Sequence, residues 1–443
     1  MINIFLIITG KILSLLSRLL NLGSGSTWPG HIALNINKNF IKDLLKDSKV
    51  KIILIAGTNG KTTTGKLIQT ILNANGKRVF QNESGANLLN GIASSIILNS
   101  NLLGKIDKVF AIFEIDENTL PLILKEINNP DYLLILNLFR DQLDRYGEVN
   151  IIAKKWKDAM RHLPSKTTLL LNSDDPQVAN LASHLKGANV KYFGMDPKNK
   201  TEKAQHASDS TYCPNCGKKL IYNSVYFSHL GDWECKSCNF KHPKKTFTKS
   251  PTYPLQGAYN QYNTNAAVLF AKINNISNLT IQQSLRNFKP AFGRQEVLNV
   301  DGKKVQIFLS KNPTSFNESL RTIASLNAPA RNASQSDAGG KNLLIVLNDK
   351  IPDGLDVSWI WDVDFEEMDQ RGSVSVSGDR VYDMALRLKY AGMSMKDEQI
   401  YTDLKKAISE NLSTLNKSET LYILPTYSAM LEVRKILTGR KIL

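Results

Sequence analysis

Short apolar runs alternate with longer amphipathic stretches through the first two thirds of this 443-residue chain. The clearest apolar runs lie at 51–56, 109–116, 132–139 and 167–172, and segments of helical periodicity separate them. Continuous apolar runs are typical of strands buried on both faces, and their alternation with helices is typical of a parallel sheet. We therefore predict an α/β fold built on a parallel sheet.

The same alternation returns near the end of the chain, after a change of pattern at 292–296. Four short apolar strands are predicted there, at 304–310, 342–349, 373–378 and 420–426, with helical segments between them. The polar stretch at 198–210 is typical of a linker, and 328–341 has the composition of a surface loop. We predict a second open α/β sheet, with the hinge at 292–296.

The first twenty residues are apolar but carry Lys11 and Arg18, which argues against a secretory leader or a membrane span. Polar and small residues recur at helical spacing: Asn3, Gly10, Ser14, Ser17 and Asn21. This pattern predicts an amphipathic helix. Two interpretations stay open: a helix packed on the domain core, or one that touches a membrane surface.

The net charge and the cysteine content limit the classes of partner and the cellular compartment. The net charge of +16 favours anionic partners, although a lysine-rich solvated surface would give the same value. We find no RNA-binding fingerprint or arginine-rich tail, so we expect no nucleic-acid partner. All four cysteines lie between 213 and 238, which leaves none for scattered disulfides and indicates a reducing, cytoplasmic location.

The sequence Gly57-Thr58-Asn59-Gly60-Lys61-Thr62 follows the first predicted strand and opens a helix. Glycines at such a turn let backbone N–H groups point at phosphate oxygens, and the helix N-terminus favours negative charge. The lysine can reach the terminal phosphates, and the threonine hydroxyl can bind Mg²⁺. Ile55 stands where the general motif has a further glycine, so this is a shortened phosphate loop.

Further motifs follow in order: Glu114 in 113–118, the element 137–148, the strand end 171–176, Asn260 and Arg294. Together with the loop they resemble the Mur ligase superfamily, which includes folylpolyglutamate synthase. The resemblance implies an ATP-dependent ligase in which Lys61 and Glu114 are catalytic and Mg²⁺ is held by Thr62 and Glu114. The implied ATP-binding residues are Gly57, Thr58, Asn59, Gly60, Lys61, Thr62, Thr63, Asn260 and Arg294.

The chain departs from that family at several points. Gln142 stands where many members have a metal-binding histidine, and Lys154 and Lys155 lie near the position of a carbamylated lysine without matching its spacing. We expect surface lysines there. About 50 residues precede the phosphate loop, too few for a domain of roughly 100 residues. We therefore expect no N-terminal UDP-binding domain.

Two C-x-x-C pairs, Cys213/Cys216 and Cys235/Cys238, are separated by 18 residues. This spacing predicts a four-cysteine zinc ribbon, inserted at 205–245, in which Zn²⁺ has a closed thiolate shell and a structural role. Paired redox thiols are the alternative. His229 and His242 lie nearby, but four thiolates need neither.

The segment 347–366 crowds aspartates beside two tryptophans. With 25–34, 84–93 and 424–431 it resembles the Mur-ligase-like subunits of lipid II isoglutaminyl synthases. That resemblance implies amidation of D-isoglutamate in lipid II to D-isoglutamine, with ammonia from a glutamine amidotransferase partner, GatD. It also implies that an aspartate, Asp356 or as second choice Asp353, completes the partner's catalytic site. A turn cap is the structural alternative for Asp356.

The predicted architecture is thus a central P-loop ATPase domain at 1–295 and a Rossmann-like C-terminal α/β domain at 296–443 that contacts the glutaminase. A glutamine-hydrolysing site needs a cysteine nucleophile, and every cysteine is assigned to the ribbon, so a partner is expected. A folylpolyglutamate synthase-like ligase and a non-catalytic scaffold remain alternatives. The basic charge and first helix also allow contact with the inner membrane face.

Overall fold

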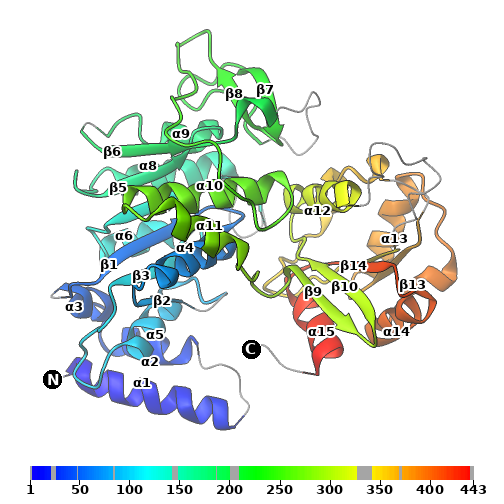
Figure 1. Cartoon of the computed structure of the whole chain (residues 1–443), viewed down its shortest axis with the longest axis horizontal. Helices are drawn as coiled ribbons and strands as arrows, with labels where there is room; N and C mark the ends of the chain where they lie inside the picture. The colour runs from blue at the N-terminus through cyan, green and yellow to red at the C-terminus, as the bar shows by residue number, and fades with distance from the viewer. Residues whose placement is uncertain are drawn as a thin grey trace.

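The computed structural model describes residues 2–20, 26–46, 48–82, 85–141, 148–185, 187–199, 209–326, 342–368 and 372–439. Two six-stranded sheets lie side by side, joined at the start of β9 (Figure 1). Predicted features at 142–147 (with Gln142), 201–208 and 327–341 fall outside the described residues.

The first sheet is parallel, with strand order β2-β3-β1-β4-β5-β6. Its strands are β1 (Lys51–Ala56), β2 (Val79–Gln81), β3 (Phe110–Glu114), β4 (Tyr132–Ile135), β5 (Thr168–Asn172) and β6 (Asn189–Phe193). Its helices are α1 (Ile2–Leu19), α2 (Trp28–Ile36), α3 (Phe40–Lys46), α4 (Lys61–Ala74), α5 (Leu89–Asn99), α6 (Leu120–Glu126), α8 (Val149–Met160), α9 (Pro176–Asn180), α10 (Ala258–Ile273) and α11 (Asn278–Arg286). The predicted parallel sheet is confirmed.

Helices cover both faces of this sheet. Along β1, Ile52 and Leu54 enter a core formed with α2, α5, α6 and α8, whereas Ile53 and Ile55 enter a core formed with α4, α10 and α11. Burial on both faces explains why the strand is apolar at consecutive positions rather than at alternate ones. The parallel arrangement brings the carboxyl ends of β1, β3, β4 and β5 to one edge, facing the second sheet.

The second sheet has the order β13-β12-β11-β14-β10-β9, and only the β9–β10 pair is antiparallel among the described pairings. Its strands are β9 (Arg294–Val300), β10 (Lys303–Phe308), β11 (Asn342–Val346), β12 (Val374–Ser377), β13 (Ile400–Tyr401) and β14 (Thr420–Pro425). Its helices are α12 (Pro313–Leu326), α13 (Val381–Tyr390), α14 (Leu404–Thr414) and α15 (Tyr427–Thr438), with 3₁₀ turns η3 (Ser358–Asp362), η4 (Phe365–Glu367) and η5 (Asp397–Gln399).

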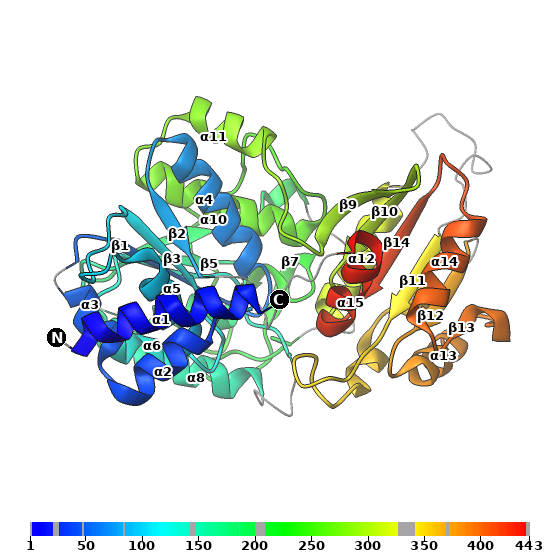
Figure 2. The ribbon, with the colours of Figure 1, turned by 90° about the horizontal axis from the view of Figure 1, so that it is seen from below.

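The second sheet is thus mixed, because β9 pairs antiparallel with β10. Strand β9 was not among the predicted strands. Its polar alternation is typical of an edge strand with one exposed face. Helices α12 and α13 pack on one face of this sheet, and α14 and α15 pack on the other; in Figure 2, α12 and α15 are the two nearer the first sheet. The chain enters β9 through Gly293 and Gln295, which both have positive φ (69° and 57°), and this conformation is costly for Gln295 because it carries a Cβ.

The cysteine segment folds into a hairpin, β7 (Ile221–Phe227) and β8 (Leu230–Glu234), that stands beyond β6 at the top of Figure 1, after the short turn η1 (Pro197–Asn199). Trp233 is fully buried beneath it and donates from its indole nitrogen to the carbonyl of Ser173, 3.2 Å away. The ribbon is therefore anchored to the end of β5.

Within the described residues, no helix is long and apolar enough to cross a bilayer. The predicted N-terminal helix is present as α1, packed on α2 and α5 along the lower edge of the molecule in Figure 1.

Candidate active site

The phosphate loop joins β1 to α4 as predicted. Gly57 and Gly60 have φ values of 142° and 91°, which other residues rarely adopt. A Cβ at Gly60 would lie 2.0 Å from Oδ1 of Asn263 on α10. Glycine is therefore required at position 60 both for the turn and for the close approach of α10.

The Lys61 side chain is buried at this turn. Its Nζ donates to the Gly57 carbonyl at 2.5 Å and lies 3.4 Å from both carboxylate oxygens of Glu117. Burial raises the pKa of Glu117, and the charges of Lys61 and Lys311 oppose that rise. Glu117 follows β3 in the same segment as Glu114, and the sequence analysis missed it although it lies only three residues further on.

Thr62 and Glu114 meet as predicted. The Thr62 hydroxyl donates to Glu114 Oε2 at 2.7 Å, and Gln81 Nε2 donates to the other carboxylate oxygen at 2.7 Å. Burial raises the Glu114 pKa, while Thr62 and the positive charge of Arg294 act in the opposite direction. The site therefore contains a buried carboxylate with oxygen neighbours, a set that suits a hard divalent cation.

Arg294, at the start of β9, brings the second sheet to the loop. Its guanidinium donates to Thr62 Oγ1 at 3.1 Å, although the two residues are 232 positions apart in the chain. Burial lowers the Arg294 pKa, and the charge of Glu114 counteracts this. The predicted hinge arginine therefore lies directly beside the predicted metal-binding pair.

Lys311, which follows β10, is the second residue that sequence analysis missed. Its Nζ forms an ion pair with Asp141, which follows β4 in the first sheet. Burial lowers the Lys311 pKa, but Asp141 and Glu117 outweigh burial, so the pKa is raised and the lysine stays charged. The signal available in the sequence was that Lys311 directly follows a predicted strand. That position does not reveal that the lysine pairs with an aspartate of the other sheet.

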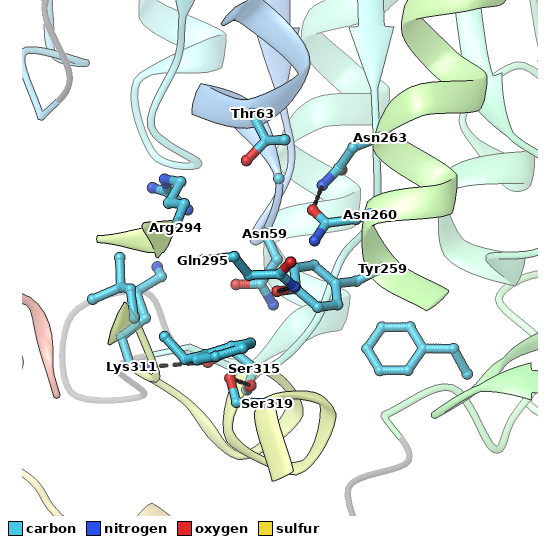
Figure 3. A pocket seen from close by; sticks show the side chains of 14 residues that line it. Asn59, Thr63, Tyr259, Asn260, Asn263, Arg294, Gln295, Lys311, Ser315 and Ser319 are labelled. Carbon is cyan, nitrogen blue, oxygen red and sulfur yellow. Dashed lines mark hydrogen bonds between the residues drawn. The ribbon is translucent and has the colours of Figure 1, made fainter. Parts of the chain in front are cut away.

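Arg294 and Lys311, with Asn59 and Gly60 of the phosphate loop, line a cavity of about 590 Å³, including the space that opens to solvent. In Figure 3, Arg294 and Lys311 lie on one side and Tyr259, Asn260 and Asn263 on the other, with Asn59 between them. The Asn59 Nδ2 is buried and has no hydrogen-bond partner among the described residues. A free amide donor in a glycine turn fits a phosphate oxygen.

The remaining predicted nucleotide residues lie around this cavity. Thr63 and Asn260 line it, and Asn260 accepts a hydrogen bond from Asn263 at 3.3 Å. Thr58 instead donates from its hydroxyl to the Phe139 carbonyl, 3.1 Å away, and so shapes the loop. Lys154 and Lys155 are both exposed on α8, as surface lysines would be.

The four cysteine sulfurs lie within 4.8 Å of one another, with Cys213–Cys238 at 3.6 Å and Cys216–Cys235 at 3.5 Å. A tetrahedral site with Zn–S distances of about 2.3 Å requires sulfur separations close to these. The arrangement is compatible with a zinc site.

The two histidines near the ribbon contact the first sheet. His242 Nε2 lies 2.7 Å from Asp174, and His229 packs against Phe139 and lies 3.6 Å from Asp175. Asp174 also accepts from Tyr262 at 2.8 Å and pairs with Lys245 at 2.9 Å. The histidines therefore join the ribbon to the end of β5.

Asp353 and Asp356 differ sharply in environment. Asp353 is buried and accepts hydrogen bonds from the backbone N–H and the hydroxyl of Ser428, in the first turn of α15. Asp356 is exposed, and its Oδ1 accepts from the Ser358 N–H at 2.8 Å, so it does cap the turn. Of these two aspartates, only Asp356 has a carboxylate oxygen that another protein could reach.

The surface around Asp356 is unusually apolar. Five large side chains there are between 49% and 71% exposed: Leu355, Trp361, Tyr382, Leu386 and Tyr390. The residues that line a hollow beside them include Leu355, Asp356, Trp361 and Leu386, together with the ion pair Arg380–Asp383. We call this surface the Asp356 face; exposed clusters of this kind are typical of protein interfaces.

Comparisons with known proteins agree with this architecture. Residues 55–271 match the Mur ligase middle domain, and residues 309–430 match the MurT ligase C-terminal family. A pseudomurein peptide ligase type C from Methanothermus fervidus has the same fold, with a TM-score of 0.64 at 23% identity, over 90% of this chain and 81% of that one.

Two relatives are similar over nearly their whole length. The chain is 32% identical to the lipid II isoglutaminyl synthase (glutamine-hydrolyzing) subunit MurT of Streptococcus pneumoniae, over 95% of this chain and 94% of the relative. It is 31% identical to the subunit of the same name from Staphylococcus aureus, over 92% and 91%. The chain therefore belongs to the MurT family of the Mur ligase superfamily.

Proposed function

We propose that this chain is the ATP-dependent amidating subunit of a lipid II isoglutaminyl synthase. It converts the α-carboxylate of D-isoglutamate in the lipid II stem peptide to the amide of D-isoglutamine. The observation that carries the proposal is that Lys61, from the first sheet, and Lys311 and Arg294, from the second, act on the same two buried carboxylates, Glu114 and Glu117, beside a cavity that Lys311 and Arg294 line. Three cations at one site suit the transfer of a highly charged phosphoryl group.

The loop residues would hold the triphosphate of ATP. Gly57 and Gly60 leave the backbone N–H groups room to approach phosphate oxygens, and Asn59 Nδ2, which has no partner among the described residues, supplies a further donor. Asn260 and Tyr259 line the opposite wall, where the nucleoside would lie. Mg²⁺ would be held by Thr62 and Glu114, and when bound it neutralises charge on the phosphates.

A carboxylate is a poor electrophile, so it must be activated before an amine can attack it. Its oxygen attacks the terminal phosphorus of ATP, the bond to ADP breaks, and an acyl phosphate forms. Ammonia then adds to the acyl carbon, loses a proton, and expels phosphate. Lys61, Lys311 and Arg294 stabilise the charge that moves in the first step, because burial strengthens each electrostatic contact.

The ammonia would come from a partner. All four cysteines of the chain lie in the ribbon, where their sulfurs cluster within 4.8 Å, so none is placed as a glutaminase nucleophile. We propose that a GatD-like glutamine amidotransferase docks on the Asp356 face. Asp356 would orient the partner's catalytic histidine, as the third member of a triad does.

We further propose that Zn²⁺ fills the cysteine cluster with a structural role. Four thiolates leave no open coordination position, and the ribbon side chain that lines the cavity, Phe227, is apolar. We also retain the division into an ATPase domain (1–295) and a C-terminal domain (296–443), together with a cytoplasmic location. The mixed sheet begins at Arg294, two residues before that boundary.

The test is reconstitution with the partner. The purified chain, the amidotransferase, lipid II, ATP and glutamine should yield ADP and amidated lipid II, and ammonium should replace both glutamine and the partner. Folate with glutamate should give no ADP; turnover of that pair instead would favour the folylpolyglutamate synthase-like alternative. Failure to form ADP with lipid II under either nitrogen source would overturn the proposal.

A further inference from the structure

Helix α1 buries Leu6 and Ile7 in the core of the first sheet together with part of its polar stripe, and it also leaves an apolar side exposed to solvent, where an ordinary surface helix is polar. Gly10 and Ser14 are buried, and a Cβ at Gly10 would lie 3.0 Å from Ile97 and 3.1 Å from Pro29. Asn3 accepts a hydrogen bond from Asn37 at 2.8 Å and donates to Asp43 at 3.3 Å. Small and polar residues thus let the helix pack closely against α2, α3 and α5.

The opposite side of α1 is almost wholly aliphatic and aromatic. Its exposed side chains, with those that continue it at Leu20 and Trp28, are Ile2, Ile4, Phe5, Ile8, Ile12, Leu15, Leu16 and Leu19. Phe5, Leu15 and Leu19 are 64%, 59% and 69% exposed. We call this surface the α1 face.

The charge of Lys11 does not interrupt the α1 face. Its Nζ turns toward the protein and donates to the Leu98 carbonyl at 3.2 Å, and burial lowers its pKa. The turn beside the start of α1 extends the apolar surface, since Leu102 and Leu103 are exposed and a Cβ on the adjacent Gly104 would lie 3.2 Å from Ile7. A continuous apolar surface of this extent indicates an interaction site.

Lysines flank the N-terminal end of the face. Residues 38–51 contain five lysines and two aspartates, and Lys38, Lys42, Lys46 and Lys49 are exposed. In both Figure 1 and Figure 2, α3 lies beside the start of α1. Pairing two copies through this face would bring like charges together, whereas an anionic surface would attract them.

We propose that the α1 face docks this chain on an anionic lipid bilayer, with the helix lying in the plane of the interface. The apolar residues would enter the boundary between headgroups and acyl chains, and Trp28 would lie at headgroup depth. The proposal rests on the proposed function in one respect: lipid II is held in a membrane, so docking would bring the cavity to its substrate.

The test is flotation of the full chain with vesicles of phosphatidylcholine containing phosphatidylglycerol, compared with phosphatidylcholine alone. A helix variant, F5Q/I12Q/L16Q, replaces three exposed residues with good helix formers, so the fold should be kept. The matched control is L279Q/V297Q/I221Q, at exposed apolar positions far from α1. Thermal unfolding of both variants checks that they remain folded.

Wild type and control should bind the anionic vesicles, and the helix variant should partition about tenfold less, since three apolar contacts are lost. Binding should weaken with added salt and without phosphatidylglycerol, and K42Q/K46Q should weaken that charge dependence. No vesicle binding by the wild type, or equal binding by all variants, would overturn the proposal. So would light scattering that shows a wild-type dimer converted to monomer by the helix variant.

Vesicle binding needs neither ATP nor lipid II, so it succeeds or fails independently of the amidation. A second measurement joins the two properties. With the partner present, the helix variant should show a raised KM for lipid II in vesicles and an unchanged rate on a water-soluble precursor with a short prenyl chain. Equal loss on both substrates would indicate damage to the ligase and contradict docking.

Discussion

The strand ends of the two sheets use polar residues in opposite ways. In the first sheet, Lys61, Glu114, Asp141 and Asp174 follow four neighbouring strands and are all buried. In the second, the segment after β11 buries Asp353 and exposes Asp356 among apolar side chains. Buried charges that are held by neighbouring side chains can act on a substrate bound inside the protein. An exposed aspartate in an apolar surface can act only on a second protein that docks there.

This difference divides the proposed reaction between two places. Phosphoryl transfer would take place between the sheets, where Lys311 and Arg294 complete a site that the first sheet begins. Ammonia would be produced outside this chain, by a partner on the Asp356 face, which lies at the same edge of the second sheet as Lys311 because β10 and β11 are both parallel to β14. Substitutions on either side of that division would affect different steps of the reaction.

Lys61→Ala should give the largest effect, a loss of about a thousandfold in amidation rate, because a buried cation beside the moving phosphoryl group is removed. ADP release and amidated lipid II should fall together with either glutamine or ammonium. Lys66→Ala is the matched control, because Lys66 lies one turn further along α4 and its Nζ donates to Gln69 at 3.3 Å, away from the cavity. Intact amidation in Lys61→Ala would support the non-catalytic scaffold.

Asp356→Asn should impair the production of ammonia without impairing the ligase site. We expect about a hundredfold loss of glutamine-dependent amidation, because the neutral amide would no longer orient a histidine in the partner. Amidation driven by ammonium should be unchanged, and so should complex formation by gel filtration. Equal loss with both nitrogen sources would mean that Asp356 serves the ligase site or the fold instead.

Lys311→Met should lower the ammonium-dependent rate by about thirtyfold, since one of three cations at the cavity is lost. It also leaves the Asp141 carboxylate buried without its partner, so Lys311→Met with Asp141→Asn should be less impaired in stability than the single variant. Lys304→Met, exposed on the same strand, is the control. Additive effects of the two changes would contradict the pairing between the sheets.

Asp174→Asn should lower the free energy of unfolding by about 2 kcal/mol at neutral pH. Burial alone would raise the Asp174 pKa, but the hydrogen bond from His242 and the charge of Lys245 outweigh it and lower the pKa. A carboxyl with a depressed folded pKa stabilises above its unfolded pKa, and that contribution is lost as the pH falls. The penalty in urea unfolding, with chelator in every sample, should therefore shrink below about pH 4.

Asp353→Asn should have the smallest effect, about 1 kcal/mol of unfolding free energy, because one hydrogen bond at the start of α15 is weakened. Glutamine-dependent amidation at a temperature where the variant is folded should stay within about twofold of wild type. A selective loss of that activity would transfer the role proposed for Asp356 to its buried neighbour.

Local patterns in the sequence were sufficient to predict much of the fold and of the candidate site. A strand, a glycine turn and a C-x-x-C pair are local structures that depend on neighbouring residues. The sequence therefore predicted β1, the phosphate loop and the cysteine cluster. The pairing of Thr62 with Glu114 was also predicted, as a metal-binding pair that the resemblance to the Mur ligases implies. The mixed character of the second sheet was not, because β9 lacks a continuous apolar run.

Which polar residues face one another depends instead on how the two sheets pack. Lys311 and Asp141 are 170 positions apart, and nothing in either segment specifies that two separate sheets will bring them together. The same holds for burial: Asp353 and Asp356 lie in one short motif, yet α15 covers the first and leaves the second exposed. The outward apolar side of α1 depended on its packing as well, since an amphipathic pattern defines two faces but not which one meets the protein.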